Sequence, residues 1–331
     1  MKILQTINKV PGGLMVVPMF IGMVINTFFP HLLKIGGFTE ALSGAGYPTI
    51  LGMYLFTVGT KMTLNTAPRM LKRGFGILLA KVGVATLFAL LVAKLFGGEI
   101  WGLSTLAILV AMSDTNGGLF MALTSAMGDK EDAGTYVPQS IETGPFLTMV
   151  ILVGAGLADI PWWSMVAVIA PIAAGAILGN LDDDIREFFG SREPLIVPFM
   201  GFTLGQTINL GNVVQGGIAG IGLGVFVLVV TGFICIVADK LLGGRGIAGA
   251  AASSTAGNST AVPKAVALAD PTYTTIAPIA TVQVTASFVV TALLTPMLTA
   301  WMYRRVHGKA ATAASAEGES LAVPKPASEP A

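Results

Sequence analysis

Five charged side chains lie inside long apolar stretches of the sequence, where such side chains are rare: Lys61, Lys81, Asp114, Glu142 and Lys264. A charge at the centre of a bilayer costs at least about 2.5 to 3.5 kcal/mol, so a residue of this kind needs a partner, a water-filled cavity or a function. A carboxyl group in a cavity that water enters alternately can take up and release a proton. Asp114 and Glu142 are therefore the candidates for proton coupling. Lys61 and Lys264 lie near the ends of their stretches, and we expect their ammonium groups to reach the membrane surface.

A polar run that ends in two glycines surrounds Asp114: Ser113-Asp114-Thr115-Asn116-Gly117-Gly118. Such a run favours a helix that stops and restarts, because Ser, Asp, Thr and Asn cap helix starts and Gly tolerates unusual backbone geometry. The restarted helix presents free amide groups and the positive end of its dipole, which suit an anion such as a carboxylate. We expect Thr115, Asn116 and Gly117 to contact this substrate. The alternative is that Asp114 only caps the second half-helix and that the glycines allow close packing.

Glu142 lies in a second polar patch of an otherwise apolar stretch. On a continuous helix Gln139, Glu142 and Thr143 would share one face, because they are three and four residues apart. The patch therefore predicts a polar surface that faces the interior of the protein. The alternative for Glu142 is a permanent structural ion pair with Lys81 or another buried lysine.

A later apolar stretch has its own polar interruption, at Ser253-Ser254-Thr255-Ala256-Gly257-Asn258-Ser259. Asn, Ser and Thr side chains can exchange hydrogen bonds with hydroxyl groups in both directions. This lining suits a polyhydroxylated solute, and we expect Gly257 and Asn258 to contact it. No nucleophile, base and orienting group occur at a recognisable spacing, so the sequence does not predict an enzyme. An intramembrane protease built on Asp114 and Glu142 would carry a further sequence motif, and none is present.

The amino-acid composition indicates whether the protein lies in water or in a membrane. Of the 331 residues, 53% are hydrophobic and 11% are charged, whereas an ordinary soluble domain carries roughly 25% charged residues. A lipid bilayer is therefore the expected partner of the apolar surface. The formal net charge of +1 gives no electrostatic reason for nucleic-acid binding. The single cysteine, Cys235, can form neither an internal disulfide nor a metal cluster, and no cofactor is expected.

Ten apolar segments are long enough to cross about 30 Å of hydrocarbon when short interruptions are allowed. They lie at about 14–29, 47–63, 74–96, 102–128, 137–158, 163–180, 194–211, 216–238, 247–268 and 276–302. In this arrangement nearly all Lys and Arg residues fall on one side. Short positively charged loops stay in the cytoplasm, so both termini are expected there. Residues 308–331, which are rich in Ala, Ser, Pro and Glu, are expected to form a disordered cytoplasmic tail.

The two halves of the chain, 1–160 and 161–307, resemble each other weakly. The second and seventh spans share a Phe-Thr pair followed by a glycine, at Phe56-Thr57-Val58-Gly59 and Phe202-Thr203-Leu204-Gly205. The first and sixth spans share a proline and a glycine at equal spacing, Pro18 with Gly22 and Pro171 with Gly175. Because each half has an odd number of spans, the two copies must have opposite orientations. The sequence thus predicts an all-α polytopic membrane protein of two inverted five-helix repeats, in which helices 4 and 9 are broken.

Motifs along nearly the whole chain resemble those of the 2-keto-3-deoxygluconate permease family. In order, they are Lys9-Val10-Pro11-Gly12-Gly13, Thr115-Asn116-Gly117-Gly118, Glu142-Thr143-Gly144-Pro145, Gly179-Asn180-Leu181-Asp182, Ala238-Asp239-Lys240-Leu241 and Ala251-Ala252-Ser253-Ser254-Thr255-Ala256-Gly257. The resemblance implies a secondary transporter of the bacterial inner membrane that imports the sugar acid 2-keto-3-deoxygluconate together with a proton. It also implies kinship with bile-acid sodium symporters, whose fourth and ninth spans are unwound and cross each other.

This resemblance leads to a hypothesis of alternating access. A panel of spans 1, 2, 6 and 7 would move against a core of spans 3, 4, 5, 8, 9 and 10, with the substrate site between them. Thr57, Gln206 and Asn209 would approach the substrate from the panel. One alternative keeps the fold but couples transport to sodium, because hydroxyl, amide and carboxylate oxygens with unwound carbonyls also suit that ion. A gated channel is the other alternative.

Overall fold

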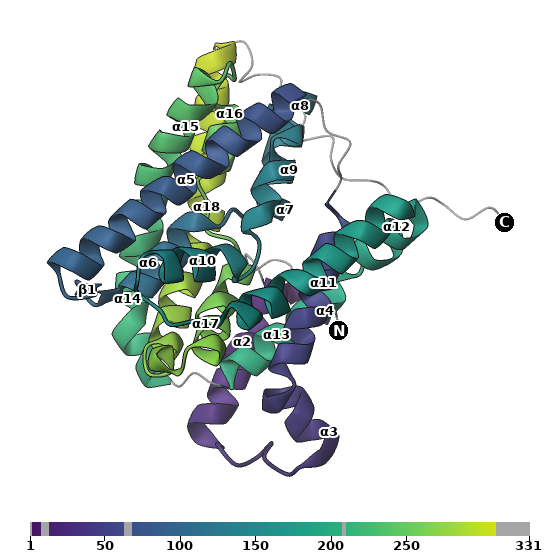
Figure 1. Ribbon diagram of the computed structural model, residues 1–331, viewed down its shortest axis with the longest axis vertical. Coiled ribbons are helices and arrows are strands. Elements are labelled where there is room, and N and C mark those ends of the chain that lie inside the picture. Colours follow the sequence, from purple (N-terminus) through teal and green to yellow (C-terminus); the bar gives the residue numbers. More distant parts are fainter. Residues whose placement is uncertain (1, 8–12, 63–67, 207–209, 309–331) are drawn as a thin grey trace.

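Helices make up almost all of the chain that the structure describes, which is residues 2–7, 13–62, 68–206 and 210–308 of a computed structural model (Figure 1). Its first half contains α1 (Ile3–Ile7), α2 (Gly13–Phe28), α3 (Gly37–Glu40), the π-helical turn η1 (Ala41–Ala45), α4 (Tyr47–Thr60), α5 (Pro68–Leu95), β1 (Glu99–Ile100), β2 (Leu103–Ser104), α6 (Thr105–Ser113), α7 (Gly117–Met127), α8 (Lys130–Gly134), α9 (Tyr136–Gln139), the 3-10 turn η2 (Ser140–Glu142) and α10 (Phe146–Gly154). Its second half contains α11 (Trp162–Leu181), α12 (Asp183–Gly190), α13 (Glu193–Gly205), α14 (Leu210–Phe226), the π-helical segment η3 (Val227–Thr231), α15 (Gly232–Leu241), α16 (Ile247–Ala251), the 3-10 turn η4 (Asn258–Ala261), α17 (Val262–Ala269), η5 (Pro271–Tyr273) and α18 (Ala277–His307). The short strands β1 and β2 pair antiparallel, with Ile100 opposite Leu103.

Five helical stretches of the described chain are long and apolar enough to cross a membrane. They are Pro68–Leu95, Thr105–Thr124, Trp162–Leu181, Gly216–Leu241 and Ala277–His307, and the shorter α2 is also apolar. Large apolar side chains remain exposed on these helices, among them Leu79 at 68%, Ile218 at 83% and Phe233 at 66%. Apolar surface of this kind is solvated by lipid rather than by water. The protein is therefore an all-helical, polytopic membrane protein.

The expected interruption of the fourth span is present between α6 and α7. Residues 114–116 lie outside both helices, and Asp114 has an extended backbone. Asn116 caps α7, because its Oδ1 accepts a hydrogen bond from Leu119 N at 3.1 Å. The polar run thus does what its residue types favour, which is to end one helix and begin the next.

The later interruption covers residues 252–257, between α16 and η4. Side chains of α18 take over the backbone bonds that a continuous helix would have made. Thr291 Oγ1 accepts a hydrogen bond from Thr255 N at 3.0 Å, and Thr295 Oγ1 donates one to Ser253 O at 3.1 Å. Non-helical backbone inside a membrane protein needs such partners, because lipid offers none.

The fifth span, predicted over 137–158, is not one continuous helix, so the helix face predicted for its polar residues does not form. The chain forms α9, then η2, and restarts as α10 only after Gly144, whose φ is +93°. Glycine adopts this conformation without steric cost, and the proline that follows it lacks a backbone N–H. Gln139, Glu142 and Thr143 consequently do not share one helix face, since Thr143 has an extended backbone.

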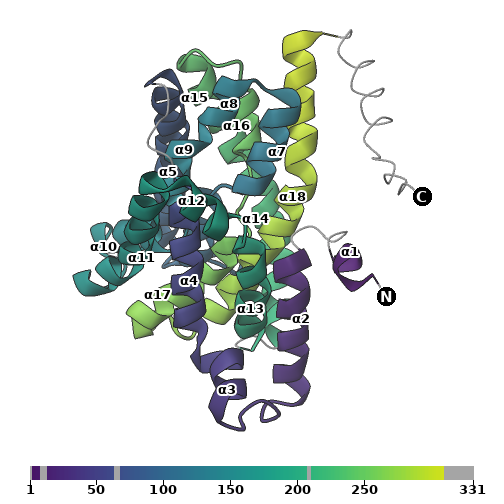
Figure 2. The same cartoon turned by 90° about the vertical axis from the view of Figure 1, so that its right-hand side faces the viewer.

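Glycines bring α2 and α13 into close contact (Figure 2). A Cβ atom on Gly22 would overlap the carbonyl oxygen of Phe202, and one on Gly205 would overlap that of Met19. The two backbones therefore touch without intervening side chains. Small residues allow this contact, which gives van der Waals attraction where lipid removes the hydrophobic driving force.

A second pair of helices, α4 and α11, packs in the same manner. A Cβ atom on Gly59 would overlap the carbonyl oxygen of Ile172, and one on Gly175 would overlap that of Phe56. These contacts join the second and sixth predicted spans, as the contacts of Gly22 and Gly205 join the first and seventh.

A buried ion cluster ties α5, α8 and α15 together at the end of the molecule that is uppermost in Figure 1. Arg73 Nη2 lies 2.5 Å from Asp132 Oδ1 and 2.8 Å from Asp239 Oδ1. The second oxygen of Asp239 accepts a hydrogen bond from Gly246 N at 2.9 Å, directly before α16 begins. Because each carboxylate has a partner, the cluster can be buried and holds these helices together.

Two predictions fall on parts of the chain that the structure does not describe. Asn209 lies between the described residues 206 and 210, and the predicted tail lies beyond Gly308. Both remain predictions.

Candidate functional site

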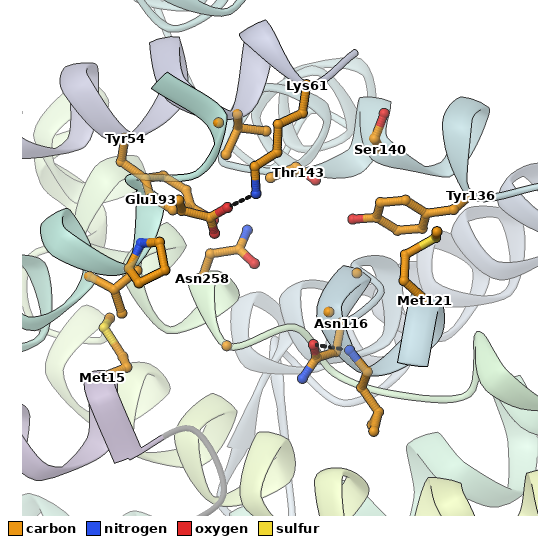
Figure 3. A pocket seen from close by; sticks show the side chains of 18 of the residues that line it. Met15, Tyr54, Lys61, Asn116, Met121, Tyr136, Ser140, Thr143, Glu193 and Asn258 are labelled. Carbon is orange, nitrogen blue, oxygen red and sulfur yellow. Dashed lines mark hydrogen bonds and ion pairs between the residues drawn. The ribbon is translucent and has the colours of Figure 1, made fainter. Parts of the chain in front are cut away.

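A cavity of about 1040 Å³ lies between two groups of helices (Figure 3). Residues of α2, α4 and α13 form one wall, and residues of α7, α9, η4 and α18 are part of the other. Its polar lining residues include Tyr54, Lys61, Asn116, Tyr136, Glu193 and Asn258. The two helix interruptions therefore meet at one wall of this cavity.

The start of α7 contributes a polar surface to this wall. The first N–H groups of a helix have no carbonyl partner within it, and the Asn116 side chain caps the one at Leu119. The N–H groups of Gly117 and Gly118 lie at the positive end of the helix dipole, which favours an anion. A Cβ atom on Gly117 would overlap the hydroxyl group of Tyr136. Glycine is therefore needed for the tyrosine to pack over the start of the helix.

Asn258 extends the polar wall from the second interruption and connects it to the first. Its Nδ2 donates a hydrogen bond to Asp114 Oδ2 at 3.0 Å, and Ser259 Oγ donates to the same oxygen at 2.8 Å. The other carboxylate oxygen of Asp114 is buried without a hydrogen-bond partner. Asp114 therefore does not cap the second half-helix, which Asn116 caps; its side chain bonds instead to the other interruption.

Lys81 lies behind this wall and binds the backbone of both interruptions. Its Nζ donates hydrogen bonds to Asp114 O and Thr115 Oγ1 at 2.9 Å, and to Ala252 O and Ser254 O at 2.8 Å. The proposed permanent ion pair with Glu142 is not formed, because no ion pair within 4.0 Å joins these two residues in the structure. The ammonium group of Lys81 instead donates hydrogen bonds to backbone carbonyl groups.

Glu142 is buried close to this lysine, with both carboxylate oxygens lacking a hydrogen-bond partner. The charges of Lys81 and Asp114 both act on it. A buried carboxylate without partners is costly when ionised. Glu142 is therefore the carboxyl group of the described interior whose charge is least compensated by direct bonds.

The structure divides the predicted substrate residues into two sets. Asn116, Gly117, Gly257 and Asn258 line the cavity, whereas Thr57, Thr115 and Gln206 do not. Their polar atoms are engaged elsewhere: Thr57 Oγ1 donates to Met53 O, Thr115 Oγ1 accepts from Lys81, and Gln206 Nε2 donates to Gly22 O. The two proton-coupling candidates, Asp114 and Glu142, are buried behind the wall rather than exposed in it.

Several residues that line the cavity are not indicated by the sequence patterns. Lys61 at the end of α4 forms an ion pair with Glu193 at the start of α13, and both line the cavity (Figure 3). The sequence predicts that Lys61 reaches the membrane surface and does not indicate this pairing. Tyr54 and Tyr136 also line the cavity, and the polar patterns in the sequence did not indicate them. Tyr54 lies one helical turn from the predicted Thr57, which was the signal in the sequence.

The donor set of the cavity does not suggest a bound metal ion. In the part of the chain that the structure describes, no three His, Cys, Asp or Glu residues come together in a group that could hold one. The lining instead offers amide, hydroxyl and backbone N–H groups beside one lysine, which is paired with Glu193. Such groups recognise an anionic, hydroxylated solute.

Apolar helices, interrupted spans and a polar cavity at the interruptions define a membrane transporter. The comparison with known proteins agrees, because the model of the 2-keto-3-deoxygluconate permease family matches residues 4–308. The chain belongs to this family, and is a membrane permease, not an enzyme.

Bacterial permeases are among its relatives. It is 49% identical to 2-keto-3-deoxygluconate permease 1 of Salmonella typhimurium, over 92% of this chain and 96% of the relative. It is 42% identical to the 2-keto-3-deoxygluconate permease of Bacillus subtilis, over 93% and 96% of the two chains. It is 40% identical to that of Escherichia coli O7:K1, over 94% and 97%.

Proposed function

We propose that this protein imports 2-keto-3-deoxygluconate across the bacterial inner membrane in symport with a proton. The observation that carries the proposal is the polar cavity at the two helix interruptions, in a chain of this permease family. The substrate combines a carboxylate with several hydroxyl groups. The start of α7 suits the carboxylate, and the amide of Asn258 suits the hydroxyl groups.

The symmetry of the glycine contacts supports two inverted five-helix repeats, residues 1–160 and 161–307. In the predicted repeat, span 1 corresponds to span 6 and span 2 to span 7. Gly22 contacts Phe202, and its counterpart Gly175 contacts Phe56, which is the counterpart of Phe202. Such reciprocal contacts are expected of a pseudo-twofold axis in the membrane plane. The interruptions in spans 4 and 9, joined by side chains, fit crossed helices at that axis.

We assign the panel to α2, α4, α11 and α13, and the core to the remaining spans. The glycine contacts support a panel that moves as one body, because they pack α2 on α13 and α4 on α11 without intervening side chains. The hydrogen bonds of Lys81 and Asp114 support a core that stays rigid. The cavity between the two bodies is where alternating access would expose the substrate.

Both termini are proposed to be cytoplasmic, so the cavity opens toward the cytoplasm. Its lining includes Lys61 at the end of span 2, Gly190 between spans 6 and 7, and Gly134 between spans 4 and 5. All three positions are cytoplasmic in the ten-span topology. This state is therefore inward-facing.

Tyr47, at the opposite end of α4, supports closure toward the outside. It is fully buried, and its hydroxyl group donates a hydrogen bond to Ala261 O in the core at 2.7 Å. Lys264 Nζ lies 4.3 Å from the centre of its ring, a cation–π contact. These contacts join panel and core, and they would have to break when the outer side opens.

The buried charges support coupling to one proton. Lys81, Asp114 and Glu142 are 0%, 3% and 3% exposed. One ammonium and two carboxylates carry a net charge of −1, which is costly in a membrane interior. Uptake of a single proton makes the cluster neutral. A cycle in which this proton enters from outside and leaves inside would drive accumulation.

The test is uptake of labelled 2-keto-3-deoxygluconate into proteoliposomes with an inward proton gradient and no sodium on either side. We expect concentrative uptake that a protonophore abolishes and that saturates with substrate, as a channel would not. Uptake that requires sodium at fixed pH would instead support the sodium-coupled alternative. Absence of uptake in both conditions would mean that 2-keto-3-deoxygluconate is not the substrate of this protein.

A further inference from the structure

The surroundings of Lys81 Nζ differ from those of an ordinary buried lysine. Four oxygen atoms lie within 2.8–2.9 Å of it: Asp114 O, Thr115 Oγ1, Ala252 O and Ser254 O. Three are backbone carbonyls that the helix interruptions have released. None belongs to a carboxylate, although two carboxylates are buried nearby.

An ammonium group has three protons, so it cannot satisfy four acceptors with one linear bond each. A cage of carbonyl and hydroxyl oxygens is instead the arrangement by which proteins replace the hydration shell of a monovalent cation. The spacing in this cage matches hydrogen bonds to an ammonium ion. Three carbonyl oxygens and one hydroxyl oxygen thus form a cage around the ammonium group of Lys81.

We propose that these four oxygens form a monovalent-cation site that Lys81 fills permanently with a tethered ammonium group. The lysine neutralises the carbonyl dipoles and holds the two interruptions together, as a bound ion would. Truncation of its side chain leaves the cage intact and able to bind a free cation, with ammonium as the reference ligand. The cation can enter from the cavity, because Asn116, next to Thr115, lines it.

This inference goes beyond the proposed transport function, because it concerns the cage and not the substrate. The experiment measures thermal unfolding of the purified Lys81→Ala protein in detergent, in ammonium chloride and in choline chloride at equal ionic strength. We expect ammonium, but not the bulky choline, to raise its Tm by about 2–4 °C in a saturable manner. The wild-type protein should show equal Tm values in the two salts.

The control is Lys264→Ala. Lys264 is largely buried too, but it lies over the Tyr47 ring and not in an oxygen cage. This variant should not distinguish ammonium from choline. Equal Tm values of Lys81→Ala in both salts would overturn the inference, as would an equal ammonium effect on the control.

A variant that keeps the charge balance covers the case in which Lys81→Ala does not fold. Lys81→Ala combined with Asp114→Asn removes one carboxylate along with the ammonium group, while the carbonyl oxygen of residue 114 stays in the cage. The same ammonium-specific rise is expected. Addition of Thr115→Val removes one cage oxygen and should reduce that rise, whereas an undiminished effect would refute a cation bound at this position.

Discussion

The two buried carboxylates at the centre of the molecule differ in their bonds. Asp114 accepts hydrogen bonds from Asn258 and Ser259, and each of these bonds favours its charged form. Glu142 accepts none. A proton that must be released and regained should bind where ionisation gains least from fixed bonds, which favours Glu142 as the site of coupling.

Glu142→Gln should therefore separate binding from accumulation. We expect the variant to retain substrate binding and substrate exchange across the membrane, because Glu142 does not line the cavity. Concentrative uptake driven by a proton gradient should be lost, together with its pH response. Uptake and exchange in proteoliposomes between pH 5.5 and 8 provide the measurement. Glu187→Gln, on the exposed α12, is the control, and a normal pH response in Glu142→Gln would remove Glu142 from the mechanism.

Lys61 is the basic side chain among the described lining residues, and an anionic substrate must compete with Glu193 for it. Lys61→Met should weaken binding about fivefold, since a half-exposed ion pair is worth up to about 1 kcal/mol. Glu193→Gln should strengthen binding, because it frees the ammonium group. Direct binding measurements on purified protein would check both changes. Lys72→Met, an exposed lysine of α5, should change nothing, and equal affinities of all variants would contradict a role for Lys61.

At the scale of the helices, α4 contains a matched pair of glycines. Gly59 touches the backbone of Ile172, whereas no atom lies within 4 Å of a Cβ atom at Gly52. Gly59→Ala should destabilise the protein by about 1–3 kcal/mol, because α4 and α11 must move apart. Gly52→Ala should raise stability by about 0.4–1 kcal/mol, because alanine restricts the unfolded chain. Thermal unfolding in detergent would detect opposite shifts of Tm, and equal shifts would mean that the close contact is unimportant.

Asp270 links the connection before α18 to the segment after α10, outside the membrane-spanning helices. Its carboxylate accepts hydrogen bonds from Thr272 Oγ1 at 2.7 Å and from Asp159 N at 2.9 Å. These hydrogen bonds lower the pKa of Asp270, and the bond from the Thr272 hydroxyl group has the largest effect. A carboxyl group whose pKa is lower in the folded state stabilises the protein above its unfolded pKa, and this contribution disappears as pH falls through the folded value.

The stability of wild type relative to Asp270→Asn should thus be constant from pH 8 to about pH 5 and should decline below about pH 4. Thermal unfolding across this range would measure it. Asp184→Asn on the exposed α12 is the control substitution. A difference between wild type and Asp270→Asn that persists unchanged at pH 3 would contradict the assignment.

The sequence predicted the helix interruptions because their cause is local. Asn116 caps α7 with its own side chain, and residue type alone favours that role. The lining was harder to predict because it depends on contacts between distant segments. Thr57 belongs to the motif shared by the two halves, but its hydroxyl group donates a hydrogen bond to Met53 O. Glu193 was not indicated by any motif, yet it lines the cavity and pairs with Lys61. Sequence periodicity reveals which residues are polar within a span, but not which of them face an empty volume.

At the scale of the whole molecule, the proposed orientation has the cavity open to the cytoplasm and Tyr47 closing the outer side. The chain suits a test by cysteine labelling, since its single cysteine, Cys235, is fully buried. Ser140 lines the cavity, and Thr275 is exposed in the connection before α18. Each can be replaced by cysteine in a Cys235→Ala background.

A membrane-impermeant maleimide should label Ser140→Cys in inside-out vesicles but not in intact cells, and should label Thr275→Cys only in cells. Saturating 2-keto-3-deoxygluconate should slow the reaction of Ser140→Cys, because the substrate occupies the same volume. Thr275→Cys should react at an unchanged rate. Reversal of both labelling patterns would mean that the termini are external. Reversal at Ser140→Cys alone would mean that the resting transporter opens outward, so that the contact of Tyr47 with Ala261 is not its outer closure.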